Sequence, residues 1–553
     1  MSSPVHMRRL TGTSALLLLA AAAAGCGDRN PLWDQEATGV EVFGLNDAVA
    51  VADPSASRVL LLTTDTEQEL RVTSVRTQRG VRTVRPAPDR SKLFVVSSGD
   101  GDMRPPAGED AQGAALEIVT REAVTAVRYP LSEPLAGLAL DPRGQWAVLY
   151  ADNTSESLVR NPNELLLVDL TQPPSATNPH PHTLRSFGGR PQRFTFTEML
   201  ALPGGARRLL IVETELDVAV LDLLHPEAPE ITIQLTSGQD TRQLHPAGVV
   251  VSDGEPTASD DARIAIRLAN DSSVLLAQLV PGDGRDFRPD LNLVDVGGLA
   301  SDAAFVRTDN GVLALAVLVP QRSTAVLVDP LTSRTQDIAL PASYRRLSLV
   351  TNVAGAGGAG ATPAIDVALL WNGDGGGGVS FWELGRTAGT PYRSVETVGV
   401  TTGVTSVVDV AGMHPELKIL GTKEASFFLL DLKTRTSAPF LTSIAGVSLA
   451  PSRGGDRAWV YVPGLSELSV VDLQTLHPER LRIDRAVNQL FEIAALDASG
   501  APSATARSLV VWHSAGNGGV TIYDARGTDA ATAIDQRHNY AGLLTEELDA
   551  QSE

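Results

Sequence analysis

A short unit recurs along most of this chain, and that repetition constrains the fold more than any other feature. Each unit has an apolar run that ends in a turn, a second apolar run, a polar gap, and a third apolar run that ends in Asp. The clearest copies are residues 138–170 and 447–473, and weaker copies are residues 84–96, 209–223, 313–329, 418–432 and 509–524. Between residues 44 and 548 there is room for about ten units of about 50 residues each.

The apolar runs are predicted to be buried β-strands. They are about four to eight residues long, rich in Val and Leu, and bounded by turn residues, which is typical of strands covered on both faces. An Asp at a strand end can accept hydrogen bonds from backbone N–H groups in the turn that follows, so we interpret these residues as structural. They are Asp169, Asp222, Asp329, Asp431, Asp472 and Asp524.

These strands predict an all-β fold built by radial repetition. A single conventional core stops growing near ~250–300 residues, so a longer body of short strands needs another solution. Helical periodicity is scarce, which is evidence against a parallel α/β sheet because its strands are joined by helices. We therefore predict a β-propeller of four-stranded blades over residues 44–548, with about 7–10 blade-like repeats. One ring of ten blades, a smaller ring with extra strands, and two rings all remain open.

Three of the units carry a more specific pattern of a turn followed by an aromatic strand. The matches are Asp141-Pro142-Arg143-Gly144 with Trp146, Pro88-Asp89 with Phe94, and Pro451 with Trp459 and Tyr461. The pattern resembles the YVTN-type β-propeller repeats of bacterial envelope proteins, which combine a Pro-Asp-Gly-like turn, an aromatic-Val strand and a Val-Asp strand end. The resemblance implies a propeller in a bacterial envelope. It implies no particular activity, because propellers host many unrelated functions.

The N-terminus has the features of an export signal. Arg8 and Arg9 form a positive start, no acidic residue precedes Asp28, and an apolar run extends from Ala15 to Ala24. A run of this length is too short to span a bilayer, which takes ~20 residues, so it favours a cleaved secretory signal over residues 1–25.

The signal ends in Ala23-Ala24-Gly25-Cys26, which resembles the bacterial lipoprotein signal. In that signal, small residues precede a Cys that is lipidated and becomes the mature N-terminus. The resemblance implies a lipidated N-terminus and tether over residues 26–43, with the body held at a membrane of the cell envelope, on its periplasmic or surface side. Residues 549–553 are predicted to form a flexible tail. The alternative is that Cys26 is an ordinary residue near a standard cleavage site.

Composition excludes several classes of function. Cys26 is the single Cys, which rules out a disulfide framework and a Cys-based zinc site. Acidic residues outnumber basic ones by 65 to 45, giving a net charge of -20. Because an acidic body repels phosphate backbones, we expect no nucleic-acid partner.

No motif identifies a catalytic, cofactor-binding or metal-binding residue. A Gly-x-Ser-x-Gly elbow and a His-Glu-x-x-His helix are both missing from the sequence. Gly355, Gly357 and Gly360 have dinucleotide-loop spacing, but Pro363 and another strand follow where a helix is needed. Calcium is the least implausible ion, although the acidic loops lack the full calcium-loop spacing and are interpreted as solvated surface. These loops contain Asp100, Asp102, Asp260, Asp261, Asp283, Asp286 and Asp290.

Two functional hypotheses follow. The first is a lipid-anchored, non-catalytic propeller that binds a protein or another envelope component through its long loops at 98–114, 252–262 and 353–363. The second is a propeller enzyme with a metal or a quinone in its channel, which predicts inward carboxylates or His side chains converging on one point. A purely structural or adhesive surface role is a third possibility. For the ring itself, we expect Val40 to Gly44 to pair with the strands of the last blade and lock the chain ends together.

Overall fold

The structure is a computed structural model that describes most of residues 37–544. The predicted signal peptide, Cys26 and the predicted tail lie outside the described residues. Within 37–544 the undescribed stretches are 102–104, 106–109, 123–124, 186–188, 203–204, 236–242, 253–261, 282–286, 308–312, 351–366, 385–394, 401–402, 411–413, 415, 442–446, 484, 514–517 and 526–537.

The described chain forms ten four-stranded antiparallel sheets, which we number as blades in chain order. Blade 1 has β1 (Glu41–Gly44), β2 (Val49–Asp53), β3 (Arg58–Thr64) and β4 (Leu70–Arg76). Blade 2 has β5 (Val81–Pro86), β6 (Leu93–Ser97), β7 (Ala115–Val119) and β8 (Val127–Pro130). Blade 3 has β9 (Gly137–Leu140), β10 (Trp146–Tyr150), β11 (Glu164–Asp169) and β12 (His180–Thr183). Blade 4 has β13 (Pro191–Leu202), β14 (Gly205–Thr214), β15 (Val218–Asp222) and β16 (Ile231–Ile233). Blade 5 has β17 (Pro246–Val251), β18 (Arg263–Leu268), β19 (Ser273–Pro281) and β20 (Phe287–Asp295).

The second half continues in the same order. Blade 6 has β21 (Asp302–Arg307), β22 (Leu313–Val319), β23 (Thr324–Val328) and β24 (Thr335–Ala339). Blade 7 has β25 (Arg346–Val350), β26 (Val367–Trp371), β27 (Val379–Glu383) and β28 (Val395–Val398). Blade 8 has β29 (Val404–Asp409), β30 (Leu417–Thr422), β31 (Phe427–Asp431) and β32 (Thr436–Leu441). Blade 9 has β33 (Ser448–Pro451), β34 (Arg457–Tyr461), β35 (Glu467–Asp472) and β36 (Pro478–Arg482). Blade 10 has β37 (Val487–Leu496), β38 (Pro502–His513), β39 (Gly519–Asp524) and β40 (His538–Ala541).

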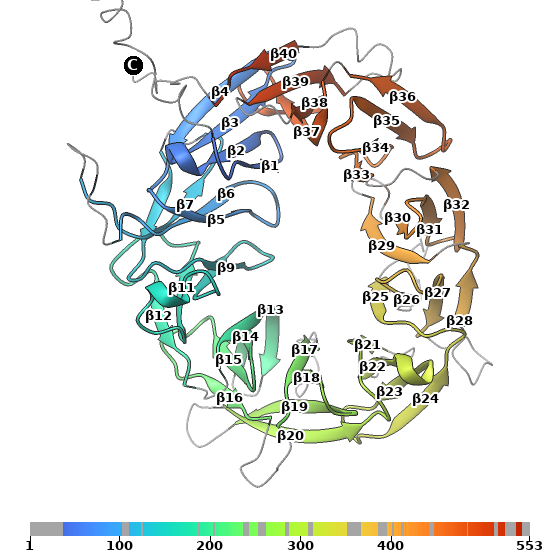
Figure 1. The fold of residues 1–553 in the computed structure, drawn as a ribbon. Helices are drawn as coiled ribbons and strands as arrows, with labels where there is room; N and C mark the ends of the chain where they lie inside the picture. The colour runs from blue at the N-terminus through green and yellow to red at the C-terminus, as the bar shows by residue number, and fades with distance from the viewer. Residues whose placement is uncertain are drawn as a thin grey trace, which may run out of the picture.

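The blades stand around one ring, with the first strand of each blade toward the centre and the fourth at the perimeter (Figure 1). The prediction of an all-β propeller with four-stranded blades is therefore confirmed, at the upper end of the predicted blade number. The alternatives of a smaller ring with extra strands and of two rings are wrong. The first blade begins at Glu41, slightly before the predicted start of the body at residue 44.

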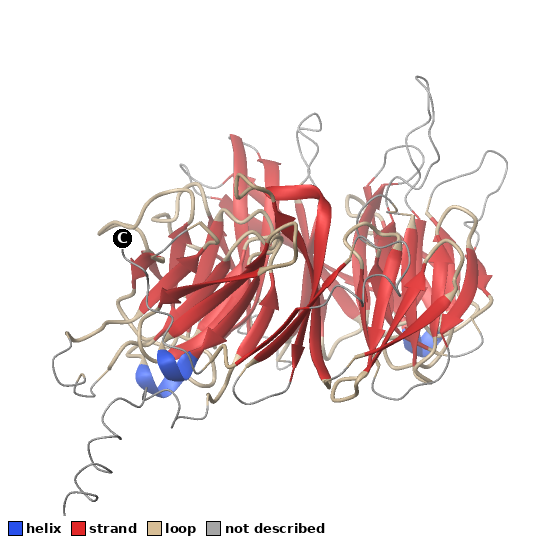
Figure 2. Ribbon diagram, turned by 90° about the horizontal axis from the view of Figure 1, so that it is seen from above, coloured by secondary structure: helices blue, strands red, loops and turns tan. Residues whose placement is uncertain are grey.

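Helices contribute almost nothing to the described chain (Figure 2). Three 3₁₀ turns lie between second and third strands: η2 (Pro54–Ala56), η3 (Glu156–Leu158) and η4 (Pro320–Arg322). Among the described residues, no helix is long and apolar enough to cross a membrane.

Burial changes with radius across each blade, as the sequence pattern predicts. Every residue of β2 and β3 in blade 1 is buried, because these two strands have a neighbouring blade on each face. By contrast, four of the five residues of β24, at the perimeter of blade 6, are exposed. The apolar runs of a sequence unit are therefore the first three strands of a blade, and the polar gap is the loop between the second and third strands, as in β9, β10 and β11 of residues 138–170.

The apolar core is divided among the interfaces between blades. Each of the ten hydrophobic clusters in the described residues combines side chains from two neighbouring blades. One of them joins the first and last blades, with Val51 and Leu60 packed against Val510 and Ile522. The ring is thus closed by the same apolar packing that holds all of its other interfaces.

The expectation that Val40 to Gly44 pairs with the last blade is wrong. The segment forms β1, which pairs with β2 of its own blade in the register Glu41↔Ala52, and blade 10 has four strands of its own. Because blade 10 is complete from its own consecutive strands, the ring closes without a strand from the N-terminal segment.

The contact between blades 1 and 10 is made by close packing and hydrogen bonds, without an exchanged strand. A Cβ atom on Gly44 of β1 would lie 2.7 Å from the Phe491 ring of β37, so glycine lets the two blades approach. Beside this contact, the Ala494 N–H donates to the Asn46 carbonyl at 3.0 Å. Arg58 of blade 1 donates to the carbonyl of Leu544, near the end of the described chain, at 2.7 Å.

The strand-end Asp residues have the structural role predicted for them. At five positions the carboxylate accepts a hydrogen bond from a backbone N–H two residues later: Asp169, Asp222, Asp329, Asp431 and Asp472. For the sixth, Asp524, the residue two positions later lies outside the described residues. At Asp329, the hydrogen bond from the Thr332 hydroxyl is the main reason that the carboxyl pKa is lowered from its usual value. These carboxylates fix the turn between the third and fourth strands.

The ring has two faces that carry different loops. Since the strands of a blade alternate in direction, the loops joining strands two and three share one face with the linkers between blades; we call it the 2–3 face. The loops joining strands one and two lie on the opposite face, the 1–2 face. The described ends of the predicted contact loop 98–114, residues 98–101 and 110–114, lie between β6 and β7 on the 2–3 face. The described ends of loop 252–262, Ser252 and Ala262, lie between β17 and β18 on the 1–2 face, and residues 353–363 lie outside the described residues. Loops 98–114 and 252–262 therefore start and end on opposite faces of the ring.

The closure predicts a specific sensitivity at Gly44. We expect Gly44→Ala to lower the free energy of unfolding by about 1–3 kcal/mol, because the added methyl group overpacks the contact with Phe491. Gly113→Ala is the matched control, since its Cβ would have no atom within 4 Å, and it should change stability by less than about 0.5 kcal/mol. Urea unfolding of both variants provides the measurement, and equal midpoints would contradict the closure contact.

Candidate binding surface at the channel mouth

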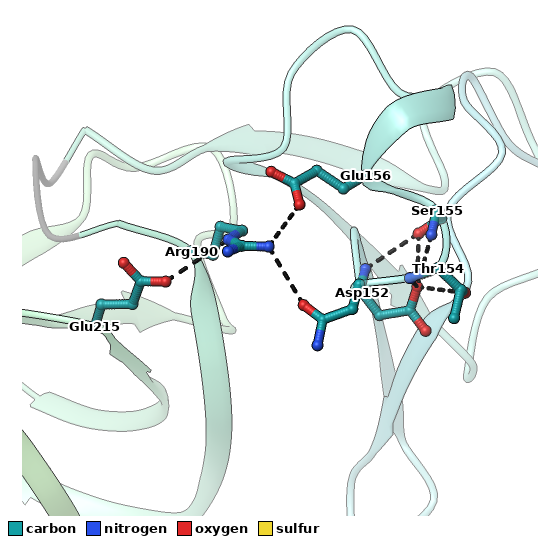
Figure 3. Close-up of polar contacts among 7 residues, drawn as sticks. Asp152, Thr154, Ser155, Glu156, Arg190 and Glu215 are labelled. Carbon is teal, nitrogen blue, oxygen red and sulfur yellow. Dashed lines mark hydrogen bonds and ion pairs between the residues drawn. The ribbon is translucent and has the colours of Figure 1, made fainter.

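The 2–3 face around the channel carries charged side chains that connect successive blades. Arg190 lies in the linker between blades 3 and 4 and reaches into the 2–3 loops of both (Figure 3). Its Nη1 donates to Glu156 Oε2 of blade 3 at 2.5 Å and to Asn153 Oδ1 at 3.3 Å. Its Nε lies 3.7 Å from Glu215 Oε1 of blade 4. One guanidinium group therefore links two blades at the rim.

The loop that Arg190 contacts in blade 3 is held by its own side chains (Figure 3). Asp152 Oδ1 accepts hydrogen bonds from the backbone N–H groups of Thr154 and Ser155, both at 2.9 Å, and from their hydroxyl groups. This pattern is typical of an Asp that stabilises a turn. The carboxylate serves the loop conformation and presents Glu156 to Arg190.

A buried acid and an exposed cation meet at the start of the first strand of blade 4. Arg193 is the Cα partner of Glu213, next to a bulge in β13, and its Nη1 lies 3.2 Å from Glu213 Oε2. The same nitrogen donates to the Ala247 carbonyl of blade 5 at 3.0 Å. Burial raises the pKa of the Glu213 carboxyl above its usual value, and the positive charges of Arg193 and Arg267 oppose that shift. The Arg193 side chain itself is 60% exposed.

Arg267 makes the next link, from blade 5 to blade 6. Its guanidinium group lies over Gly248 of β17, where a Cβ would collide with it. From there it donates to the Ser301 carbonyl at 2.6 Å and to the Ala300 carbonyl at 3.3 Å in the following linker, and to Ala247 at 3.2 Å. Burial lowers the pKa of Arg267, but an arginine stays protonated at any physiological pH.

The series continues to blade 7 and ends in Arg346, which has no partner in the part of the chain that the structure describes. Asp302 Oδ2, at the start of blade 6, accepts a hydrogen bond from the Leu347 N–H of blade 7 at 2.9 Å. Arg346, the residue before Leu347, is exposed, and its guanidinium group has no hydrogen bond or ion pair to any described residue. Neighbouring Arg345 is 63% exposed and lies 3.6 Å from Asp374. Two exposed arginines therefore stand side by side in the chain at this point of the rim, Arg345 paired with Asp374 and Arg346 without a partner among the described residues.

A hollow lies beside these arginines, between the linkers on either side of blade 6. Its volume is about 280 Å³, slightly below the roughly 300–1,000 Å³ of sites that bury a whole small molecule. An apolar part, a polar part and one guanidinium group line it: Leu299, Ala300, Ser301, Pro320, Gln321, Ser343 and Arg345. Leu299 is 42% exposed. A hollow of this size and lining suits one anchoring side chain of a protein partner.

Asp100, one of the acidic residues considered for calcium, is paired with an arginine. Arg79, in the linker before blade 2, binds both oxygens of this carboxylate at 2.5 and 2.7 Å, and the Gln112 N–H donates to it at 2.7 Å. The hydrogen bond from Arg79 is the main cause that lowers the pKa of Asp100 to about 2. Of the other acidic loop residues, Asp290 lies on β20, and Asp102, Asp260, Asp261, Asp283 and Asp286 lie outside the described residues.

The channel enzyme hypothesis depends on a converging set of ligands. Within the part of the chain that the structure describes, no group of three or more His, Cys, Asp or Glu side chains could hold a metal ion. That observation gives the hypothesis no support there.

No sequence pattern identified the arginines that build this surface on the 2–3 face. Arg193, Arg267 and Arg346 belong to three blades and are more than 70 residues apart, so no local motif contains them. The predominance of Arg over Lys among the basic residues is the one signal in the sequence, and it does not point to any position.

Comparisons with known proteins do not assign this chain to a family. No protein-family model matches the chain, and no curated protein matches its sequence. Among solved structures, dihydro-heme d1 dehydrogenase NirN in complex with DHE is 14% identical with a TM-score of 0.39, over 72% of this chain and 74% of that one. Sqt1 from Saccharomyces cerevisiae is 15% identical with a TM-score of 0.37, over 72% and 97%. Apo AztD from Citrobacter koseri is 9% identical with a TM-score of 0.28, over 81% and 87%.

The hydrogen bonds between blades on the 2–3 face predict that Arg267 and Arg346 differ in their contribution to stability. Arg267→Met should lower the free energy of unfolding by about 2–3 kcal/mol, because it removes charged hydrogen bonds between blades 5 and 6. Arg346→Met is the control and should change it by less than about 0.5 kcal/mol, since Arg346 has no partner among the described residues. Chemical denaturation of the two variants measures the difference, and an equal loss in both would refute the assignment of Arg267 as a link.

Proposed function

We propose that this protein is a lipid-anchored propeller of the bacterial cell envelope that acts as a non-catalytic binding or assembly surface. The lipid on Cys26 holds it at a membrane, on the periplasmic or cell-surface side, and residues 26–43 tether the ring. The sequence Ala23-Ala24-Gly25-Cys26 after an apolar run supports the anchor, since a diacylated N-terminus gives stable membrane attachment.

The observation that supports a binding role is the hollow on blade 6, with the exposed Arg345 in its wall and the exposed Arg346 next to it in the chain. Leu299 and the adjoining linker offer an apolar surface, and Arg345 offers a cation that can pair with a carboxylate. Interfaces between proteins concentrate their binding energy in a few such pockets that receive a single side chain. The blade-to-blade links at Arg267 and Asp302 hold the lining segments in place, so the surface is preorganised for its partner.

The chemistry of this rim defines the kind of partner. An exposed Leu, a small hollow and two adjacent arginines fit a protein segment with an apolar side chain next to an acidic one. The acidic body as a whole disfavours nucleic acid. We therefore place the contact on the 2–3 face and expect a protein of the envelope as the partner.

The anchor is tested by metabolic labelling with a radioactive fatty acid. We expect label on the wild-type protein and none on Cys26→Ala, because that thiol is the only acceptor. The variant should also move from the membrane fraction to the soluble fraction after cell disruption. Label retained on Cys26→Ala would rule out a lipid anchor at this residue.

The binding face is tested by site-specific photocrosslinking in intact cells. A photoreactive amino acid at Gln321, in the wall of the hollow, should yield a discrete heavier adduct. The same amino acid at Gln474 is the control, because this residue is an exposed glutamine in a turn on the 1–2 face. Adducts should weaken severalfold with Arg345→Glu, which reverses the charge at the rim. No adduct from Gln321, or equal adducts from both positions, would disprove the assigned face.

A further inference from the structure

The outer strand of blade 5 differs from the other perimeter strands. β20 is nine residues long, whereas β16 of the preceding blade is three. It carries two exposed leucines at alternate positions, Leu291 at 40% and Leu293 at 44% exposure. Large apolar side chains on an edge strand mark a place where another strand can pair.

Pairing within blade 5 shows why these leucines are uncovered. Leu291 and Leu293 are the partners of Ala277 and Leu275, and these belong to the apolar cluster between blades 4 and 5. Both leucines therefore lie on the side of the sheet that faces blade 4. The short β16 does not extend far enough to bury them.

The backbone N–H and C=O groups of the same two leucines also point away from the sheet. Pro289 lies within the strand, opposite Leu279, and has no N–H to donate. Proline is tolerated in an edge strand where its nitrogen faces away from the ladder. Because this direction alternates along a strand, the N–H and C=O groups of Leu291 and Leu293 also face outward. Exposed leucines thus occur together with backbone groups that have no hydrogen bond to any described residue.

We propose that two copies of this chain associate by antiparallel pairing of their β20 strands about a two-fold axis at Asn292. In this register, Leu291 is opposite Leu293 of the second copy, and the reverse holds across the axis. Four leucines then share one face of a continuous eight-stranded sheet, and four backbone hydrogen bonds form between the outward groups of these residues. Such a contact is isologous, so it closes on itself and forms a dimer.

The charges of β20 agree with self-pairing. Asp290 is opposite Val294 of the second copy and Asp295 is opposite Pro289, so no two like charges are directly opposed. A foreign strand would have to match two leucines at this spacing, whereas a second copy does so by symmetry. The contact involves one strand from each copy, which is below the ~1,200 Å² of standard interfaces, so we expect a reversible dimer.

A cysteine at the axis tests the register directly. In this pairing Asn292 of the two copies forms a non-hydrogen-bonded pair with Cα atoms about 4.5 Å apart, which suits a disulfide. Asn292→Cys in the full-length protein, oxidised with diamide, should therefore yield a covalent dimer as the main product. Asp290→Cys is the matched control, because its two copies are offset by about 13 Å along the strand. Gln336→Cys on the exposed edge of β24 and the parent protein, whose one thiol is Cys26, complete the set.

Each outcome decides the proposal. A dimer from Asn292→Cys with less than a tenth of that yield from both cysteine controls supports it. No dimer from Asn292→Cys, or the same yield from Asp290→Cys, overturns it. A mixed disulfide with another protein in place of the dimer also overturns it and assigns the edge to a foreign strand. As a second measurement, Leu291→Lys with Leu293→Lys should raise the dissociation constant at least tenfold in sedimentation velocity, with an unchanged melting temperature; an unchanged dissociation constant counts against the proposal.

Discussion

Apolar packing between neighbouring blades is the constraint on which the rest of this structure depends. A four-stranded sheet with two apolar faces cannot bury both of them alone, so every blade needs a neighbour on each side. The ten hydrophobic clusters in the described residues meet this need, and the cluster between blades 1 and 10 is what makes the array a ring. No strand is exchanged at that point, because each blade is complete from consecutive strands. Closure therefore relies on the fit of Gly44 against Phe491 and on the hydrogen bonds around it.

Charged side chains reinforce this packing near the channel and beneath the turns. Asp141, in the turn that resembles the YVTN-type repeat, accepts hydrogen bonds from the Arg143 and Gln145 N–H groups of its own turn. The same carboxylate binds Arg208 of the next blade at 2.6 Å, and both side chains are almost fully buried. A single Asp thus shapes a turn and joins two blades. Since an unpaired buried charge is costly, such pairs also favour one order of blades over another.

The two surfaces that we assign to partners lie at different places on the ring. The hollow of blade 6 is on the 2–3 face, and β20 is at the perimeter of blade 5. A partner on the rim and a second copy at the perimeter would not compete for the same residues. If the lipid anchor holds as proposed, confinement to a membrane would raise the local concentration of copies and favour a weak dimer.

The sequence by itself determined the strands, their turns and the class of fold. Runs of Val and Leu, strand-end residues such as Asp329, and the length of the body led to a propeller of about ten units, because strand patterning and turn chemistry are local properties. It did not determine the partners of those strands, and the segment Val40 to Gly44 shows the difference: its pattern indicated a strand, but its pairing with β2 is set by three-dimensional proximity. The candidate site followed the same rule. Arg193, Arg267 and Arg346 come together only because blades 4 to 7 are adjacent in the closed ring. These are contacts between residues far apart in the chain, and they exist only once the apolar faces have brought the blades together.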